Sequence, residues 1–343
     1  MTGPATPDSA LPEGVVAPVP VETIPCVLCG GESFRTVLRG VRDRIWFKPG
    51  RYQVQICEDC RLVQTRPRPI PGEALGFYYK DTYSQDGSNI KEMYDQPFGH
   101  LLNIYRIACI EKVRKIVPED HILDVGCSFG SFLAKVHDER GCAVAGVDMD
   151  VGSIEQSVLT DRKIPCSLHI GTAAELAEQP EQHGQYSIVT YLECLEHDPD
   201  PVATLKATRQ LLKPGGLVLI EVPNWRSFWR WFWGRWWMPL FVPQHTVHFA
   251  PATLKATAEK AGLEVLHHQT MLMPVEWSLS LRGLVHDLVS PDSKPPPWVD
   301  KVLGPVIFVT WFLIEFPVQF WLRAFGFAGH QALVARRPLE SGD

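Results

Sequence analysis

The stretch from His121 to Val136, HILDVGCSFGSFLAKV, constrains the fold of this chain more than any other, together with AGVDMD from Ala145 to Asp150. Its pattern predicts an apolar strand, a glycine-bearing turn, a helix that begins near Ser131, and a second apolar strand that ends in an acid. Such a unit forms the ligand-binding half of an open α/β sheet, because the turn and the acid meet at one sheet edge. The sequence therefore predicts an α/β fold with a small-molecule site at that edge.

Four residues of this unit have the chemistry of a ligand site. Gly126 and Gly130 let the backbone approach a ligand without a Cβ in the way, and the helix that follows directs free N–H groups at an anion such as a carboxylate. Asp124 is expected to face a cationic amino group, and Asp148 is expected to accept both ribose hydroxyls. A purely structural unit without a ligand is the alternative.

A dinucleotide is a poor fit to the same turn. The dinucleotide fingerprint needs glycine where Ser128 and Ser131 stand, so the turn for a pyrophosphate is not met. The remaining pattern continues the alternation of strands and helices after Asp148. Further strands are expected at 165–171, 186–193, 213–224, 262–270 and, antiparallel, 330–337, with helices at 98–117, 201–212 and 250–261.

This order resembles the class I S-adenosylmethionine (SAM) methyltransferases, and YLECLEHDPDP and LLKPGGLVLIEVPN are especially similar to ubiquinone-biosynthesis O-methyltransferases. The resemblance implies a Rossmann-like seven-stranded sheet over residues 118–337 and SAM as cofactor, without implying a substrate. Two positions depart from the family pattern, since Thr172 and Ser187 stand where relatives often carry an acid; Glu175 or the Ala173 backbone is the substitute expected at the adenine. The residues expected at SAM are Asp124, Gly126, Cys127, Gly130, Asp148, Met149, Thr172, Ala173, Leu192 and Glu193.

Residues 24–69 carry two C-x-x-C pairs, Cys26 with Cys29 and Cys57 with Cys60. Four thiolates at this spacing predict a structural Zn²⁺ site of zinc-ribbon type, which holds a small module together and leaves no open position for catalysis. A redox pair is the alternative. With the ribbon, the chain looks like bacterial zinc-ribbon methyltransferases that accompany polysaccharide or secondary-metabolite pathways, including sugar C-methyltransferases.

The flanking segments and the composition set limits on location and partners. Residues 1–23 are expected to be a disordered tail without a secretory signal, and 70–117 a linker with a covering helix. Nine cysteines without a disulfide pattern suit the cytoplasm, and a net charge of −6 makes nucleic acid an unlikely partner. The span Arg35–Arg68 is nevertheless basic: it is either a solvated face or a contact for RNA, a phosphate-bearing substrate or an anionic membrane.

Two apolar insertions, 224–249 and 271–329, are expected to leave the sheet at its ligand-binding edge. The first holds six of the 11 tryptophans, interleaved with arginines, and is either a lipid-interface segment or a cap on the core. The second contains Val302–Leu322, which is long enough to cross a bilayer. Glu315 within this segment, and the strand expected directly after it, argue against a membrane crossing. They favour a pair of helices that is monotopic or packed on the core. A hydrophobic or carrier-linked acceptor, and a peripheral position at the inner face of the membrane, are the corresponding hypotheses.

Three histidines are candidates for the base that removes a proton from the acceptor: His197, His245 and His248, with Glu193 and Glu196 able to orient them. Structural roles and a Glu/His metal site are the alternatives. The leading hypothesis is a SAM-dependent methyltransferase acting on oxygen or carbon of a small hydrophobic, lipid-linked or sugar-linked acceptor. An RNA methyltransferase with a zinc ribbon and an inactive scaffold of the same fold are the alternatives.

Overall fold

A computed structural model describes residues 11–74, 77, 97–273, 276–291 and 293–339. Its centre is a seven-stranded sheet in the order β12-β13-β10-β9-β6-β7-β8. Strand β13 runs antiparallel to both of its neighbours, and the other neighbouring pairs are parallel. The strands are β6 (His121–Val125), β7 (Ala143–Asp148), β8 (Cys166–Ile170), β9 (Tyr186–Leu192), β10 (Leu212–Pro223), β12 (Glu264–Met271) and β13 (His330–Arg336). The predicted seven-stranded α/β sheet is confirmed.

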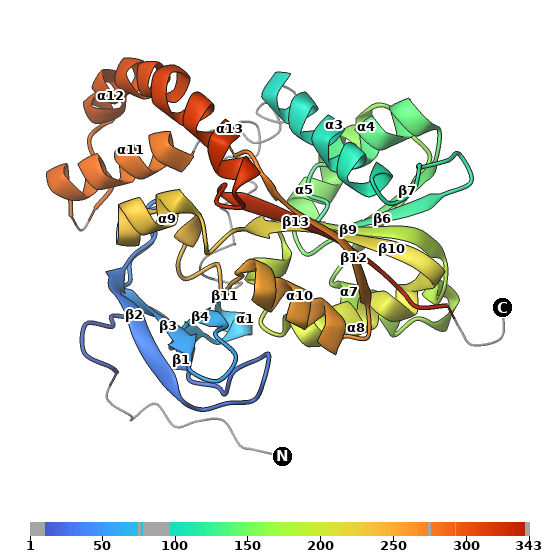
Figure 1. The fold of residues 1–343 in the computed structure, drawn as a ribbon, viewed down its shortest axis with the longest axis horizontal. Coiled ribbons are helices and arrows are strands. Elements are labelled where there is room, and N and C mark those ends of the chain that lie inside the picture. Colours follow the sequence, from blue (N-terminus) through green and yellow to red (C-terminus); the bar gives the residue numbers. More distant parts are fainter. Residues whose placement is uncertain (1–10, 75–76, 78–96, 274–275, 292, 340–343) are drawn as a thin grey trace.

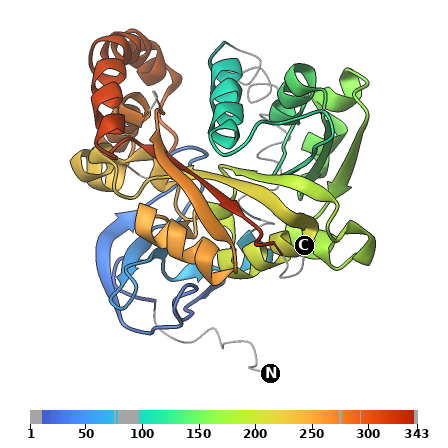
Figure 2. The same cartoon turned by 45° about the vertical axis from the view of Figure 1, so that its right-hand side comes forward.

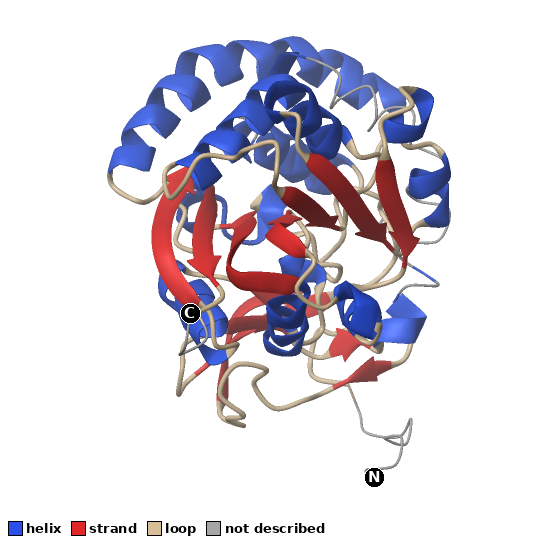
Figure 3. Cartoon of the chain, turned by 90° about the vertical axis from the view of Figure 1, so that its right-hand side faces the viewer, coloured by secondary structure: helices blue, strands red, loops and turns tan. Residues whose placement is uncertain are grey.

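Helices cover both faces of this sheet (Figures 1 and 3). One face packs against helices that contribute Ile110, Leu133 and Leu159 to a buried cluster, and the other against helices that contribute Leu176, Leu205 and Leu254. The first set is α3 (Pro97–Glu111), α4 (Ser131–Arg140) and α6 (Val158–Asp161), and the second is α7 (Ala173–Ala177), α8 (Pro201–Leu211) and α10 (Pro251–Lys260); the short α5 (Val151–Glu155) follows β7. Of the predicted tail and linker, residues 1–10, 75–76 and 78–96 lie outside the described residues.

The N-terminal region forms a smaller four-stranded sheet in the order β11-β4-β3-β2. Three strands come from the cysteine-bearing segment, whereas β11 comes from the end of the tryptophan-rich insertion and pairs with β4. Cys26 and Leu28 lie in the same buried cluster as Leu254 of α10, so the small sheet shares a hydrophobic core with the large one. The elements are β2 (Phe34–Val41), β3 (Tyr52–Cys57), β4 (Val63–Thr65) and β11 (Val247–His248), beside the short pair β1 (Val21–Glu22) and β5 (Arg68–Pro69) and the single-turn α1 (Pro71–Ala74).

The tryptophan-rich insertion packs as a cap between this small sheet and the C-terminal helices. Its helix α9 (Phe228–Trp233) lies between the blue N-terminal strands and the orange-to-red helices in Figures 1 and 2. Trp225, Trp229, Trp233 and Trp237 are buried in one cluster with residues of β2 and β3, while Trp231 is 71% exposed. Most of the aromatic area therefore serves as core, and one edge of the cap faces outward.

The second insertion forms α11 (Glu276–Val289), α12 (Pro297–Thr310), the π-helical turn η6 (Trp311–Glu315) and α13 (Phe316–Ala324). Glu315 is fully buried, and its carboxylate accepts hydrogen bonds from the backbone N–H groups of Trp277 and Ser278 at the start of α11. This acid thus satisfies N–H groups that the first turn of a helix leaves without intrahelical partners. Among the described residues, no helix combines the length and apolarity needed to cross a membrane.

Much of the positive charge of the basic N-terminal span is used inside the protein. Arg42 and Arg44 both bind the Asp287 carboxylate of α11, with N–O distances of 2.6 and 2.7 Å. The Arg66 guanidinium lies 3.8 Å from the centre of the Phe34 ring. These contacts fix the small sheet to the helical layer and leave fewer cations for an external partner.

Candidate functional site

The glycines of the turn after β6 lie close to other parts of the protein. Gly126 has φ 72°, and a Cβ there would lie 2.5 Å from the sulfur of Cys194. Gly130, with φ 78°, immediately precedes α4. The side chain of Cys127 points into the sheet, since a Cβ at Gly146 would lie 2.6 Å from its sulfur. Only the backbone of Cys127 can therefore face a ligand at this turn.

Two buried serine hydroxyls lie at the start of α4. The Oγ atoms of Ser128 and Ser131 are buried, and neither has a hydrogen-bond partner among the residues described. A buried hydroxyl without a partner is costly, and these two lie at the positive end of a ten-residue helix. The arrangement fits the carboxylate of an amino-acid ligand, which would accept from both hydroxyls. The sequence analysis treated these serines only as missing glycines.

Asp148 ends β7 and is held by the turn it faces. Its Oδ2 accepts a hydrogen bond from the Ser128 N–H at 2.8 Å, and its Oδ1 accepts one from the Asp150 N–H at 2.9 Å. Burial raises the pKa of this carboxyl, while the two backbone hydrogen bonds act to lower it. Each oxygen keeps further acceptor capacity, so the carboxylate is oriented and can still receive two hydroxyls. The neighbouring Met149 is 51% exposed.

Asp124 lies deeper, one residue before the end of β6. It is 3% exposed, and the Thr190 hydroxyl donates to its Oδ1 at 2.5 Å. Burial raises the pKa of the Asp124 carboxyl to about 7, although the Thr190 hydrogen bond and the charge of Arg106 act to lower it. A cationic ligand group at this position would stabilise the ionised carboxylate.

The segment after β8 is occupied by a helix cap. Thr172 accepts a hydrogen bond from the Glu175 N–H, and Glu175 Oε2 accepts from the Thr172 N–H at 2.8 Å, which completes a capping box for α7. Both side chains proposed for the adenine region therefore already have partners. Ala173 is buried, and Leu192 is the half-buried last residue of β9.

A carboxylate–imidazole pair, with a half-buried glutamate and a buried histidine, follows at the next strand end. Glu193 comes directly after β9, with φ 56°, and its Oε2 lies 3.0 Å from Nε2 of His330, the first residue of β13. The other two polar atoms, Glu193 Oε1 and His330 Nδ1, are buried without a partner among the described residues. Burial lowers the pKa of His330, but the Glu193 carboxylate outweighs it, so the pKa is raised overall. The sequence analysis assigned His330 only to a strand; its position at the start of an antiparallel strand was the signal that it reaches the ligand-binding edge.

A second cluster joins Glu196, His197 and His245, whose ligand atoms all lie within 4.8 Å of one another. Nδ1 of His197 donates to the Gln244 carbonyl and Nδ1 of His245 to the Pro239 carbonyl, at 3.2 and 2.9 Å. Because a carbonyl can only accept, Nε2 carries the lone pair in each neutral ring. Both Glu196 carboxylate oxygens are buried without a hydrogen-bond partner among the described residues.

The electrostatics of this cluster favour uncharged groups. Burial raises the pKa of Glu196 well above its ordinary value and lowers the pKa of His197 to about 4. Burial likewise lowers the pKa of His245. Two imidazole lone pairs beside a carboxyl can take up a proton or hold a divalent cation.

His248, the third predicted base, lies at the joint between the two sheets. It belongs to β11, and its Nε2 is 3.2 Å from the Thr65 hydroxyl, which donates to the His245 carbonyl. Burial lowers the pKa of His248 to about 3, so the ring is neutral near pH 7. The structure thus connects His248 to His245 through Thr65.

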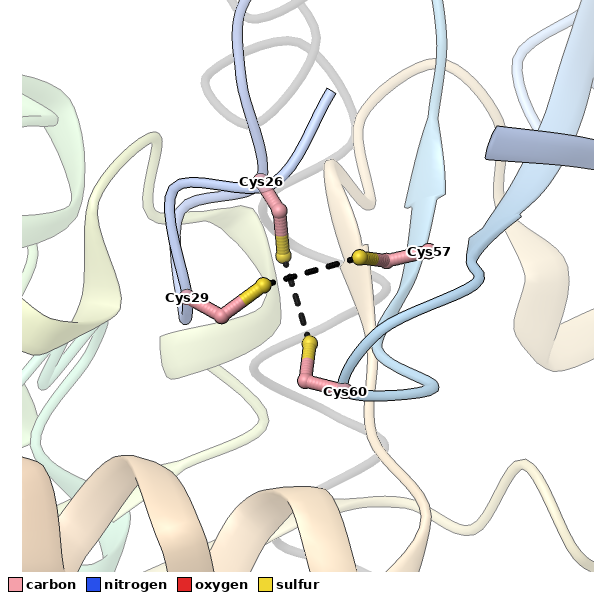
Figure 4. A group of neighbouring side chains, drawn as sticks. All are labelled: Cys26, Cys29, Cys57 and Cys60. Carbon is pink, nitrogen blue, oxygen red and sulfur yellow. Dashed lines mark hydrogen bonds between the residues drawn. The ribbon is translucent and has the colours of Figure 1, made fainter. Parts of the chain in front are cut away.

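The four cysteines of the N-terminal region converge on one point, as Figure 4 shows. The sulfurs of Cys26 and Cys60 lie 3.4 Å apart, and those of Cys29 and Cys57 lie 3.6 Å apart. Zn–S bonds of about 2.3 Å in a tetrahedron place sulfurs about 3.8 Å apart, so the donor set fits a zinc ion. The two knuckles are alike, since the N–H of the residue after each pair bonds back to the carbonyl of its first cysteine.

The chain is similar to known methyltransferases. Residues 104–268 match the family model described as a methyltransferase domain. A ubiquinone biosynthesis O-methyltransferase of Bordetella avium (strain 197N) is 34% identical over 173 residues, covering 48% of this chain and 70% of that protein. Its counterpart from Pseudomonas aeruginosa (strain LESB58) is 33% identical over 181 residues, covering 48% and 73%. Among solved structures, phosphoethanolamine N-methyltransferase 2 of Haemonchus contortus, in complex with SAM, is similar with a TM-score of 0.48, 15% identity, and coverage of 80% and 63%.

Proposed function

This chain belongs to the class I SAM-dependent methyltransferases, and we propose that it methylates an oxygen or carbon atom of a small hydrophobic, lipid-linked or sugar-linked acceptor. SAM, the cofactor that the family implies, supplies a methyl group on a positively charged sulfur. The observation that carries its placement is the pair of unpartnered hydroxyls at the N-terminus of α4, beside an acid oriented by the same turn. In this proposal Ser128 and Ser131 bind the carboxylate of SAM, Asp148 binds its ribose, and Asp124 binds its amino group.

The remaining predicted contacts belong to the same proposal. The backbone at Gly126, Cys127 and Gly130 borders the cofactor, and Glu193 lies at the end of the next strand. Since Thr172 and Glu175 already cap α7, we expect the adenine to meet apolar and backbone groups there. Those groups are Met149, Ala173 and Leu192.

Transfer to oxygen or carbon requires that the acceptor lose a proton. We propose His197 and His245, positioned by Glu196, as the first candidate acceptors of that proton, and His330, positioned by Glu193, as the second. In both groups a carboxyl lies beside an imidazole at the edge where the parallel strands end. His248 then supports His245 through Thr65.

A hydrophobic acceptor or a lipid surface is supported by exposed apolar side chains on α9 of the cap and on the C-terminal helices. Large apolar side chains there are more than half exposed, an unusual density for a surface that meets only water. Arginines of the neighbouring cap stack on aromatic rings, as Arg230 does 4.5 Å from the centre of Trp225. We place the protein in the cytoplasm, with this face toward the inner side of the membrane. The exposed side chains are Trp231, Phe232, Trp298, Val302, Val309, Leu313, Phe320 and Trp321.

We also propose that the four-cysteine cluster holds a structural Zn²⁺. All four positions of a tetrahedral ion would be filled by Cys26, Cys29, Cys57 and Cys60, which leaves none for a substrate. The ion would then stabilise β2, β3 and β4 against the methyltransferase core.

The two alternative functions have less support. An RNA contact has less support because cations of the basic span already have partners. Arg42 and Arg44 bind Asp287, and Arg66 lies over the ring of Phe34. The inactive scaffold is supported only by Ser128, Thr172 and Ser187. Ser128 becomes a ligand contact in the present proposal, and Thr172 caps α7. Ser187 donates its hydroxyl to the His121 carbonyl and so has a structural use.

The acceptor class can be tested with methyl-labelled SAM, the purified full chain, and a lipid and metabolite extract. We expect label in organic-soluble material. Label confined to RNA would contradict the proposal, and so would SAM binding without transfer to any fraction.

A further inference from the structure

A pocket of about 480 Å³ lies beside the edge strand β12, away from the turn at α4. It is bordered by the end of α3, the start of α10, and the loop after α13. In Figure 1 strand β12 lies between α13 and α10. The side chains that give it its character are Lys112, Arg226, His267, His268, Arg323 and Phe325.

The pocket is positively charged and contains no acid. Lys112, Arg226 and Arg323 carry permanent positive charge near pH 7, whereas no Asp or Glu is among its lining residues. Among the described residues, neither guanidinium forms a salt bridge. Their charge is therefore not neutralised inside the described protein.

Aromatic rings hold the two guanidinium groups in place. Arg226 lies 5.6 Å from the centre of the Phe327 ring, and Arg323 lies 5.0 Å from the centre of the Tyr105 ring. Stacking engages the face of a guanidinium and leaves its N–H edge available for a planar or tetrahedral oxyanion. Both groups are thus oriented before a ligand arrives.

The carbonyls at the end of α13 do not compete for this charge. The Arg323 carbonyl accepts hydrogen bonds from the Thr270 hydroxyl and the Gly326 N–H, and the Leu322 carbonyl accepts one from the Phe327 N–H. The negative end of the helix is therefore satisfied by local donors.

The surroundings of the pocket are apolar. Phe325, in its wall, is 71% exposed, and Phe320 and Trp321 on the adjoining helix are 63% and 65% exposed. Strand pairing sets Thr270, another wall residue, opposite Gln331, the neighbour of His330. The pocket thus lies beside β12, near the end of the sheet where His330 lies, and next to an apolar surface.

We propose that this pocket binds the phosphate group of an amphipathic molecule, whose apolar part lies along α13. The shared chemistry is a phosphate oxyanion held by two arginines and a lysine. A membrane phospholipid headgroup and a water-soluble phosphorylated compound are the two sources of such a group. The proposal rests on the pocket alone and does not depend on which atom is methylated.

The test compares the full chain with R226Q/R323Q, and with K206Q as a matched control on α8 outside the pocket. Inorganic pyrophosphate is titrated by calorimetry, and binding to phosphatidylcholine vesicles with and without phosphatidylglycerol is measured by flotation. We expect the double variant to lose about tenfold affinity per arginine for one or both probes, with K206Q unchanged. Loss for pyrophosphate alone assigns a soluble phosphorylated ligand, and loss for anionic vesicles assigns a headgroup.

Equal affinities of the native chain and the double variant for both probes would overturn the proposal, as would an equal loss in K206Q. SAM titrations on the same samples show whether the fold and the cofactor site are intact, so a failed methyltransferase assignment is separable from a failed phosphate site. If the double variant does not fold, K112Q removes one exposed cation, together with the hydrogen bond that Lys112 donates to Gln269, and the same criteria apply.

Discussion

Glu193 and His330 meet across 137 residues of sequence, with the carboxylate Oε2 3.0 Å from the imidazole Nε2. The pair joins the end of a parallel strand to the start of the antiparallel strand two places away in the sheet. Its remaining polar atoms are buried without partners among the described residues. A carboxylate that orients a histidine is a common way to prepare a base.

Where His330 is the base, H330Q lowers kcat by about 100-fold, the low end for loss of a general base. The SAM affinity of H330Q should stay within about twofold, because His330 is not among the proposed cofactor contacts. Since Glu193 raises the pKa of His330 overall, the basic form is reached only above the ordinary histidine value of about 6.5. The rate should therefore rise with pH through that raised pKa, and E193Q should shift this limb to lower pH. A native profile in H330Q would leave His197 and His245 as the bases.

Replacing Asp148 with alanine should abolish measurable SAM binding. The carboxylate is proposed to accept two ribose hydroxyls, each worth about 1.5 kcal/mol for a charged acceptor, so the loss is at least about 100-fold in Kd. Isothermal calorimetry on the native chain and D148A measures it. E259A, an exposed acid on α10, is the control that should bind normally; undiminished affinity in D148A would refute the cofactor assignment.

SAM binding should weaken as pH falls below about 7. Burial raises the pKa of Asp124 to about 7, above the ordinary value of about 3.9. The stability that the protonated carboxyl contributes is therefore fully present below pH 4 and is lost as the pH rises through 7. A cationic amino group favours the ionised form, so affinity should drop up to tenfold per pH unit below 7, with proton release on binding.

Calorimetry at pH 5.5 to 8 in two buffers of different ionisation enthalpy measures both the affinity and the released protons. D124N should bind SAM weakly and without this pH dependence. Proton release that persists in D124N would assign the effect to another group.

Loss of one zinc ligand should destabilise the whole chain. Cys57 is fully buried, and Cys26 lies in the hydrophobic cluster shared with the large sheet. We expect C57S to bind less than one zinc per chain by elemental analysis. Its Tm should fall by about 3 °C or more, the shift that about 2 kcal/mol produces in a chain of 343 residues.

Because that hydrophobic core is shared, unfolding should remain one transition by scanning calorimetry. C166S, which alters a half-buried thiol outside the four-cysteine cluster, should keep its zinc and its Tm. A separate low-temperature transition in C57S would show that the small sheet unfolds on its own.

The central unit of the fold could be predicted from the sequence alone, because its contacts are local. Strand, turn, helix and acid follow one another within 30 residues, so Gly126, Asp124 and Asp148 could be identified from their order alone. The four-thiolate site could also be predicted from the two C-x-x-C pairs. A tetrahedral site for a metal ion needs only two such knuckles brought together by a short hairpin.

Tertiary structure decided which residues share the catalytic edge and what the insertions cover. The meeting of Glu193 with His330, the pairing of β11 with β4, and the burial of four tryptophans against the small sheet all join segments far apart in the chain. Such contacts depend on how the packed layers exclude water from a common core. The local periodicity of apolar residues in the sequence does not predict this packing. For the same reason the hydroxyls of Ser128 and Ser131 could be recognised as ligand donors only once their burial and lack of partners were visible.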